Sequence, residues 1–197
     1  MPLGGRGFVT VGAAVACCAL AAACTPQPVP NSTPSISPAA TTPAESQIER
    51  QMRLDYDSAE KAYRANIAEQ DRLARAGGIR QPTAELKSTA EGEYLSAAVT
   101  SLAYIQKKGW HGTGNTTILG VAHVGWQAKR VRLMSCEDGS RLRLLDHSGS
   151  DVTPNGDSRF VQSLFVVRRD GRWRVSAFDS KSVKVFEGEP CAALCWQ

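Results

Sequence analysis

The sequence predicts an α+β domain in which three N-terminal helices pack on an antiparallel sheet built by the C-terminal half of the chain. Three observations lead to this fold class. Between residues 45 and 109 apolar residues recur at intervals of three and four, which is the spacing of one face of a helix. From Thr116 onward apolar and polar residues alternate, as in half-buried strands. Two Asp-Gly pairs, at 138–139 and 170–171, favour tight hairpin turns.

Residues 1–23 are predicted to be a signal peptide. They carry one side-chain charge, Arg6, followed by an uncharged run from Phe8 to Ala23. That run is shorter than the roughly 20 residues of a membrane-spanning helix. It ends in small residues directly before Cys24, which resembles the bacterial lipoprotein signal, although Ala21 occupies the usual Leu position. We therefore expect a lipid on Cys24, with cleavage by an ordinary signal peptidase and secretion as the alternative.

Residues 24–44 are predicted to be the lipidated cysteine and a disordered tether. The segment from Thr25 to Ala44 is uncharged and rich in proline, serine and threonine. Such a composition buries too little apolar surface to order itself, and its prolines favour an extended chain. Residues 45–197 remain as one folded domain. The net charge of +4 is too small to indicate a nucleic-acid partner.

Six cysteines divide by position along the chain. Cys17 and Cys18 are expected to leave with the predicted signal peptide, and Cys24 is the candidate for the lipid. The others lie in the exported domain, where disulfides persist: Cys136, Cys191 and Cys195. We predict a Cys136–Cys191 disulfide, with Cys195 as the alternative partner of Cys136 and Cys191–Cys195 as a poorer pairing. No histidine joins these cysteines at the spacing of metal ligands, so no metal site is predicted.

The first helix is predicted to begin at a capping box, Thr42-Pro43-Ala44-Glu45, and to end before Gly77-Gly78. Its apolar stripe comprises Ile48, Met52, Tyr56, Ala59, Tyr63 and Ile67. A second helical region opens at Pro82. A second capping box, Ser88–Glu91, followed by Gly92, predicts a division into two short helices, of which the last ends at Gly109.

Five strands are predicted: Ile118–Val124, two paired around the first Asp-Gly turn (Lys129–Cys136 and Arg141–Asp146) and two paired around the second (Arg159–Arg169 and Arg172–Phe178). The turns set the register and place Gln162 opposite Asp179. The same register pairs Val166 with Val175. The inward, apolar face is predicted to comprise Val131, Leu133, Leu142, Leu144, Leu164, Val166, Val175 and Ala177. Asp146, Gln162 and Asp179 then fall on this otherwise apolar face and are candidates to line a pocket. The alternative is that these polar groups reach water or backbone partners at strand ends.

The opposite sheet face is predicted to be basic. It carries Arg130, Arg132, Arg141, Arg143 and Arg174. On a membrane-tethered domain such a surface could meet anionic headgroups, at about 1 kcal/mol for each nearby basic residue. An ordinary solvated sheet face explains the same pattern.

A family resemblance rests on the Cys24 signal and on four segments of the domain: Ala59–Ala76, Gly109–Gly114, Leu133–Ser140 and Trp173-Arg174-Val175. With these segments, the order of helices followed by strands resembles the NTF2-like (SnoaL-like) α+β cone, and more narrowly the small actinobacterial lipoproteins that carry this domain. The resemblance implies three helices on a strongly bent antiparallel sheet. Enzymes of the superfamily use an Asp with a His or Tyr inside the cone, whereas other members bind ligands or assemble.

These observations predict a lipid-anchored protein on the extracytoplasmic face of the cell membrane. Its domain is expected to bind an envelope protein or a small apolar ligand, without catalysis and without a cofactor. No Ser-His-Asp, metal or phosphate-loop pattern is present in the sequence. The alternatives are a secreted SnoaL-like isomerase or hydrolase and a prophage-type lipoprotein that excludes superinfecting phage.

Overall fold

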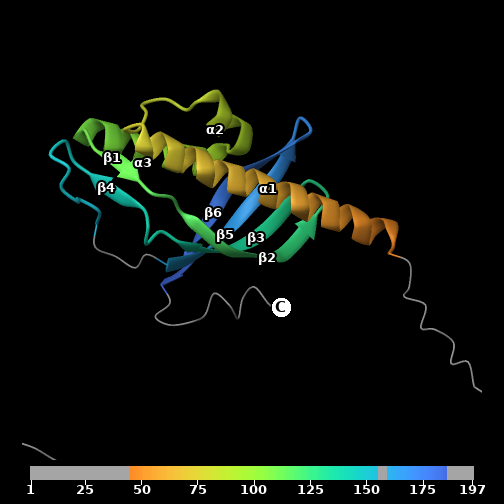
Figure 1. Cartoon of the computed structure of the whole chain (residues 1–197). Coiled ribbons are helices and arrows are strands. Elements are labelled where there is room, and N and C mark those ends of the chain that lie inside the picture. Colours follow the sequence, from red (N-terminus) through yellow and green to blue (C-terminus); the bar gives the residue numbers. More distant parts are fainter. Residues whose placement is uncertain (1–44, 155–158, 186–197) are drawn as a thin grey trace, which may run out of the picture. The chain divides into compact units, whose positions relative to one another are not determined.

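The computed structural model describes residues 45–154 and 159–185, all within one compact unit, Pro43–Gln197. Helices α1 (Gln47–Arg75), α2 (Ala84–Thr89) and α3 (Gly92–Lys108) precede strands β1 (His111–Thr113), β2 (Thr117–Gln127), β3 (Arg130–Asp138), β4 (Arg143–Leu145), β5 (Arg159–Arg169) and β6 (Arg172–Val185) (Figure 1). The predicted α+β class, with helices packed on an antiparallel sheet, is confirmed. The predicted signal peptide, Cys24 and tether lie outside the described residues.

The described residues form three helices, and neither of the two predicted capping boxes lies at the start of one of them. Ser46 caps α1 and forms a capping box with Glu49, so this helix starts later than the Thr42–Glu45 pattern indicated. Thr83 caps α2, and Glu91 precedes α3 without a side-chain cap, so the predicted Ser88–Glu91 capping box is wrong. Gly109 ends α3 in the left-handed conformation that glycine adopts at low cost. No helix in the described ranges is long and apolar enough to cross a membrane.

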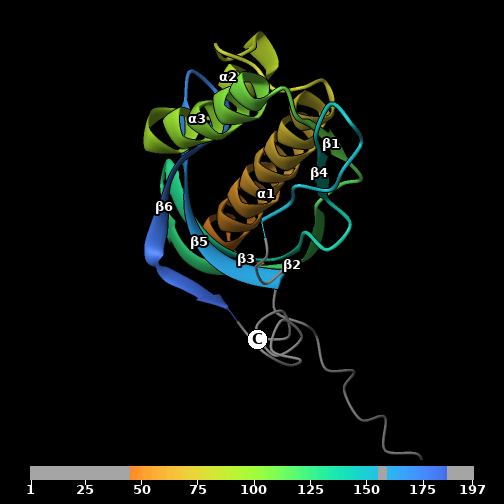
Figure 2. The same ribbon diagram turned by 90° about the vertical axis from the view of Figure 1, so that its left-hand side faces the viewer.

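The larger sheet is antiparallel with the order β2-β3-β5-β6, and it curves around α1, which contacts all four strands (Figure 2). The short strands β1 and β4 pair with each other in a second sheet. The predicted hairpin between Lys129–Cys136 and Arg141–Asp146 is therefore wrong. Strand β3 pairs with β2 and β5 instead, and the β2–β3 turn falls at Ala128-Lys129, which has no Asn-Gly or Asp-Gly signature.

A β-bulge changes the predicted register of β5 and β6. Val166 lies opposite Val175, as predicted, but Phe165 then lies opposite Ala177, because Ser176 is an extra residue in β6. Asp179 consequently pairs with Ser163 and not with Gln162. A shift of one residue exchanges the two faces of a strand, and it moves Asp179 to the face that points away from the helices.

The buried apolar residues form two clusters. The first lies between α1 and the sheet and contains Tyr56, Ala59, Tyr63, Ala90, Tyr94, Val131, Leu133, Leu164, Val166, Trp173 and Val175. The second joins the three helices and contains Leu73, Ala74, Leu86, Leu102 and Ile105. Members of both clusters line a pocket between the helices and the sheet.

Candidate functional site

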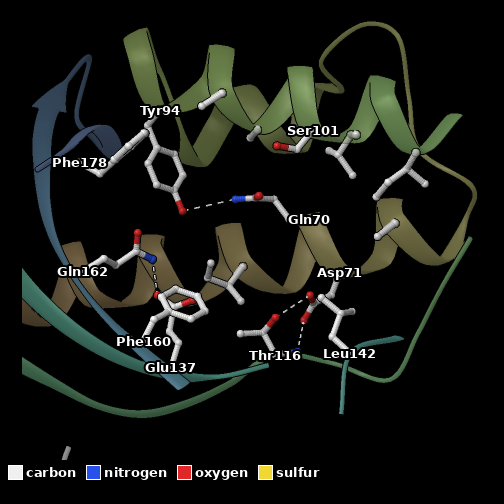
Figure 3. Close-up of a pocket in the computed structure, with 16 residues that line it drawn as sticks. Gln70, Asp71, Tyr94, Ser101, Thr116, Glu137, Leu142, Phe160, Gln162 and Phe178 are labelled. Carbon is white, nitrogen blue, oxygen red and sulfur yellow. Dashed lines mark hydrogen bonds between the residues drawn. The ribbon is translucent and has the colours of Figure 1, made fainter. Parts of the chain in front are cut away.

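A pocket of about 440 Å³ lies between α1, α3 and the sheet. Figure 3 shows helix α3 with Tyr94 and Ser101 on one side and α1 with Gln70 and Asp71 on the other. Members of both apolar clusters line it, among them Tyr94 of the first and Leu102 of the second. Ser101 lines the pocket and is exposed, so the pocket reaches the surface along α3. Its size falls within the range of small-molecule sites.

The walls are mainly apolar, and the polar groups gather at the sheet. The apolar lining residues are Ile67, Ala74, Ala97, Ala98, Leu102, Ile105, Leu142, Phe160 and Phe178. Glu137 of β3 and Gln162 of β5 supply polar groups from the sheet, while Gln70, Asp71, Ser101, Tyr94 and Thr116 complete the lining. A pocket of this composition suits a ligand with an apolar body and few polar atoms.

Glu137 is the central polar group of the pocket, and its side chain is almost completely buried, with 2% of the residue exposed. Its carboxyl accepts hydrogen bonds from the Tyr63 hydroxyl and the Gln162 amide. The Tyr63 hydroxyl also lies 2.8 Å from the Ser135 hydroxyl. Period-two alternation along β3 brings Ser135 and Glu137 to the same face, above which the middle of α1 places Tyr63.

Burial raises the pKa of Glu137 above its ordinary value, and the hydrogen bonds from Tyr63 and Gln162 act in the opposite direction. The charge of Asp71 adds to the increase of this pKa. Burial also raises the pKa of Tyr63 and that of Tyr94, and the nearby Glu137 charge contributes to both shifts. Burial in this site therefore stabilises the protonated form of each of these three groups relative to the same group in water.

A second carboxylate, Asp71, closes the side of the pocket near β2. It accepts hydrogen bonds from the backbone N–H of Thr116 at 2.8 Å and from its hydroxyl at 3.0 Å. Gln70 of α1 also lines the pocket, and its amide donates to the Asn66 side-chain oxygen at 2.6 Å and to the Tyr94 hydroxyl at 3.4 Å. These bonds fix the polar lining before any ligand arrives, which lowers the entropic cost of binding.

Of the three residues predicted to line a pocket, the structure places only Gln162 in this one. The prediction for Asp146 is wrong: this residue does not line the pocket, and its carboxylate accepts hydrogen bonds from Ser148 and Ser150 in the turn after β4. The prediction for Asp179 is also wrong, because the bulge in β6 turns this residue to the outer face. There its carboxylate lies 3.6 Å from the Arg132 guanidinium.

Sequence reasoning missed Glu137, Tyr63, Tyr94 and Asp71. A signal for Glu137 was present, since it continues the inward series Val131, Leu133, Ser135 by one further step of two. We missed Glu137 because the predicted strand ended at Cys136, whereas β3 continues to Asp138. No comparable signal marked Asp71, which lies among charged residues of α1.

The structure does not assemble the predicted basic surface. Arg130 and Arg132 lie together on the outer face of β3, with their guanidinium groups 4.3 and 5.7 Å from the Phe165 ring centroid. Arg174 is mostly buried and pairs with Glu91 at 3.4 Å. Arg141 and Arg143 lie at or before β4, in the other sheet, and Arg143 pairs with Asp151 at 3.5 Å. Only two of the five arginines therefore share an exposed surface.

Cys136 is disulfide-bonded. Both candidate partners, Cys191 and Cys195, lie outside the described residues, so the pairing with Cys191 stays a prediction. Within residues 45–154 and 159–185, no group of three His, Cys, Asp or Glu side chains is arranged to hold a metal ion.

No family model matches the chain, and no curated protein matches it. Similar solved structures include the following two. The intermembrane space region of the chloroplast protein ARC6 is 18% identical, with 61% of this chain and 94% of that chain covered and a TM-score of 0.40. A putative calcium/calmodulin dependent protein kinase II association domain from Xanthomonas campestris is 16% identical, with 71% and 89% covered and a TM-score of 0.26. At this level of similarity, neither structure assigns a function to the chain.

Proposed function

We propose that this chain is a lipoprotein of the extracytoplasmic face of a cell membrane and that its domain, an NTF2-like cone, binds a small apolar ligand without catalysis. The observation that carries the proposal is the pocket of about 440 Å³, whose apolar walls converge on Glu137 and Gln162. The curved sheet around α1 is consistent with a cone. The Cys24 signal supports the lipid anchor, and secretion without a lipid is the alternative.

Ligand binding accounts for features that a purely structural domain does not require. A well-packed core leaves few voids larger than a water molecule, because unfilled apolar volume destabilises the fold. Here the small side chains of Ala97, Ala98 and Ser101 on α3 leave space opposite the sheet. The pKa of Glu137 stays raised although Tyr63 and Gln162 donate to its carboxyl, so these bonds do not fully offset the cost of its burial. Hydrogen bonds to a ligand would offset more of that cost.

A second candidate function, acid–base catalysis by an isomerase or hydrolase, is favoured by the raised pKa of Glu137. Two features weigh against it: Tyr63 and Gln162 both donate to Oε1 of this carboxyl and hold it in place, and the described residues that line the pocket include no histidine or lysine with which it could share a proton transfer. Binding without catalysis is therefore the function that this geometry supports better.

The pocket is tested with the neutral apolar fluorophore N-phenyl-1-naphthylamine, titrated into the full-length protein in mild detergent against protein-free micelles. We expect saturable binding at one site, lost in Ala97→Phe, which fills the half-buried part of the pocket wall. Ser96→Phe is the matched control, because Ser96 precedes Ala97 on α3 but does not line the pocket. Equal binding by both variants, or no saturable binding by the wild type, would contradict the proposal.

The anchor is tested separately with Cys24→Ala in the native host. We expect the wild type in the membrane fraction, because acyl chains contribute about 0.8 kcal/mol for each buried methylene. The variant should accumulate as precursor or as soluble protein. A variant that remains membrane-bound with an unchanged mature mass would disprove lipidation and leave the ligand pocket unaffected.

A further inference from the structure

The charged side chains that line the pocket are all of one sign. Among its sixteen lining residues the only charged types are Asp71 and Glu137, and none is lysine, arginine or histidine. This occurs in a chain whose net charge is +4. Neither carboxylate takes part in a salt bridge within the described residues, where eleven such bridges occur. A negatively charged ligand would therefore meet two carboxylates and no basic group in the lining.

Aromatic rings complete the surroundings of the carboxyl. Tyr94 and Phe178 meet edge to face, with ring centroids 6.1 Å apart and an interplanar angle of 76°. Both rings line the pocket, as does Phe160, which lies opposite Glu137 in the sheet register (Figure 3). The negative face of an aromatic ring attracts ammonium groups, most strongly where water is excluded.

We propose that the ligand of this pocket is an organic cation, an ammonium group on an apolar body, with the ammonium held against Glu137 and the neighbouring rings. This inference rests on the proposed function and specifies its ligand class. The apolar walls of α1 and α3 receive the body of the ligand, and Asp71 adds negative potential at the side of the pocket.

Binding of such a cation is coupled to the release of a proton from Glu137. The groups that face Glu137 are Tyr63 and Asp71 from α1 and Tyr94 from α3, whereas β5 and β6 present only uncharged side chains, Phe160, Gln162 and Phe178. Because the bound ammonium stabilises the ionised carboxylate, one proton leaves Glu137 whenever the free protein holds it protonated. The affinity for the cation therefore rises with pH until Glu137 is ionised in the free protein.

Three probes on one skeleton test the inference by titration calorimetry of the full-length protein in detergent: 3-phenylpropylamine, 3-phenylpropan-1-ol and 3-phenylpropanoate. At pH 7.5 we expect the amine to bind about tenfold more tightly than the alcohol, with no detectable binding of the carboxylate. Glu137→Gln should remove the tenfold advantage of the amine while it changes the affinity for the alcohol by less than about twofold. Glu93→Gln, at an exposed carboxylate in the first turn of α3, is the matched control.

The outcomes separate the two proposals. If the alcohol binds as tightly as the amine, the cation inference fails and the apolar pocket stands. If no probe and no fluorophore binds to the wild type, both fail. Should Glu137→Gln not fold, the wild-type pH profile decides: the affinity for the amine must rise as the pH increases from 4.5 while that for the alcohol does not, and a flat profile for the amine overturns the inference.

Discussion

Strands β3 and β5 pair along the whole length of β3, and the inner face that they form is aliphatic in one half and polar in the other. In one half Val131 lies opposite Val166 and Leu133 opposite Leu164, and all four side chains are fully buried. In the other half Ser135 lies opposite Gln162 and Glu137 opposite Phe160. The first half is filled by α1 and forms the core, whereas the second half borders the pocket.

The difference shows how one sheet serves two purposes. The aliphatic half contributes stability through the apolar surface it removes from water. The polar half keeps its groups hydrogen-bonded to Tyr63 and to one another, so its burial costs less than that of unpartnered groups. Substitutions in the aliphatic half should therefore change only the free energy of unfolding. Substitutions in the polar half should change the free energy of unfolding, its dependence on pH and the binding of ligands.

The largest effect is expected from Leu133→Ala in the aliphatic half. Leu133 is fully buried, and the lost burial and the cavity together should lower the free energy of unfolding by about 2–5 kcal/mol. Urea denaturation at pH 7 measures it. Leu119→Ala is the control, because Leu119 is 46% exposed on β2 and should cost less than about 1 kcal/mol. Equal losses for the two variants would show that this half is not the core.

Tyr63→Phe comes next, at the border between the two halves. It removes one hydroxyl while it keeps the ring, and leaves Glu137 and Ser135 each without one hydrogen-bonding partner. We expect a loss of about 1–3 kcal/mol in the free energy of unfolding, measured in the same way. Tyr104→Phe, at a tyrosine that is 51% exposed, should change it by less than about 0.5 kcal/mol. A neutral Tyr63→Phe would mean that the buried network contributes nothing.

The third prediction concerns pH. The pKa of Glu137 is raised in the folded state above its ordinary value of 4.5, so the folded state holds its proton more tightly than the unfolded state does. Stability from this group is present below pH 4.5 and is lost as the pH rises through the folded-state pKa. The slope is at most about 1.4 kcal/mol per pH unit in that window.

Glu137→Gln removes this titration and keeps the shape of the side chain. The difference in unfolding free energy between the variant and the wild type should therefore increase in favour of the variant as the pH rises from 4.5, and then level off. Urea denaturation at intervals from pH 4.5 to 8 gives the curve. A difference that stays constant across this range would show that Glu137 has the same pKa in both states.

The aliphatic half was accessible from the sequence, and the polar half was accessible only in part. Regular alternation predicted an inward face of eight residues, of which Val131, Leu133, Leu164, Val166 and Val175 are fully buried. The prediction was wrong for Ala177, which the bulge turns to the outer face, and for Leu142 and Leu144, which lie next to or in β4 outside the larger sheet. The helices followed from their apolar spacing and from Gly109. Gln162 was named as a pocket residue because it lies on the same face.

The remaining features depend on geometry that no local pattern specifies. The Asp138-Gly139 pair suggested a tight hairpin, yet β3 before it and β4 after it belong to different sheets, and the real β2–β3 turn at Ala128-Lys129 lacks turn-forming residues. The extra residue Ser176 is visible only in the paired strands. The pocket also requires α3 to lie opposite β3 and β5, an arrangement that depends on contacts between residues far apart in the chain.

The smallest effect is expected at Asp179, which the displaced register would have put in the polar half. The carboxylate lies on the outer face, where it is 35% exposed and 3.6 Å from the Arg132 guanidinium, a group that also donates to Ser163 at 2.8 Å. An ion pair exposed to this degree is screened by water, so Asp179→Asn should lower the free energy of unfolding by no more than about 1 kcal/mol. Binding of the fluorophore and of the three phenylpropyl probes should stay unchanged, in contrast to Glu137→Gln. Loss of binding in Asp179→Asn would place this carboxylate in the pocket and would restore the regular register that the bulge at Ser176 replaces.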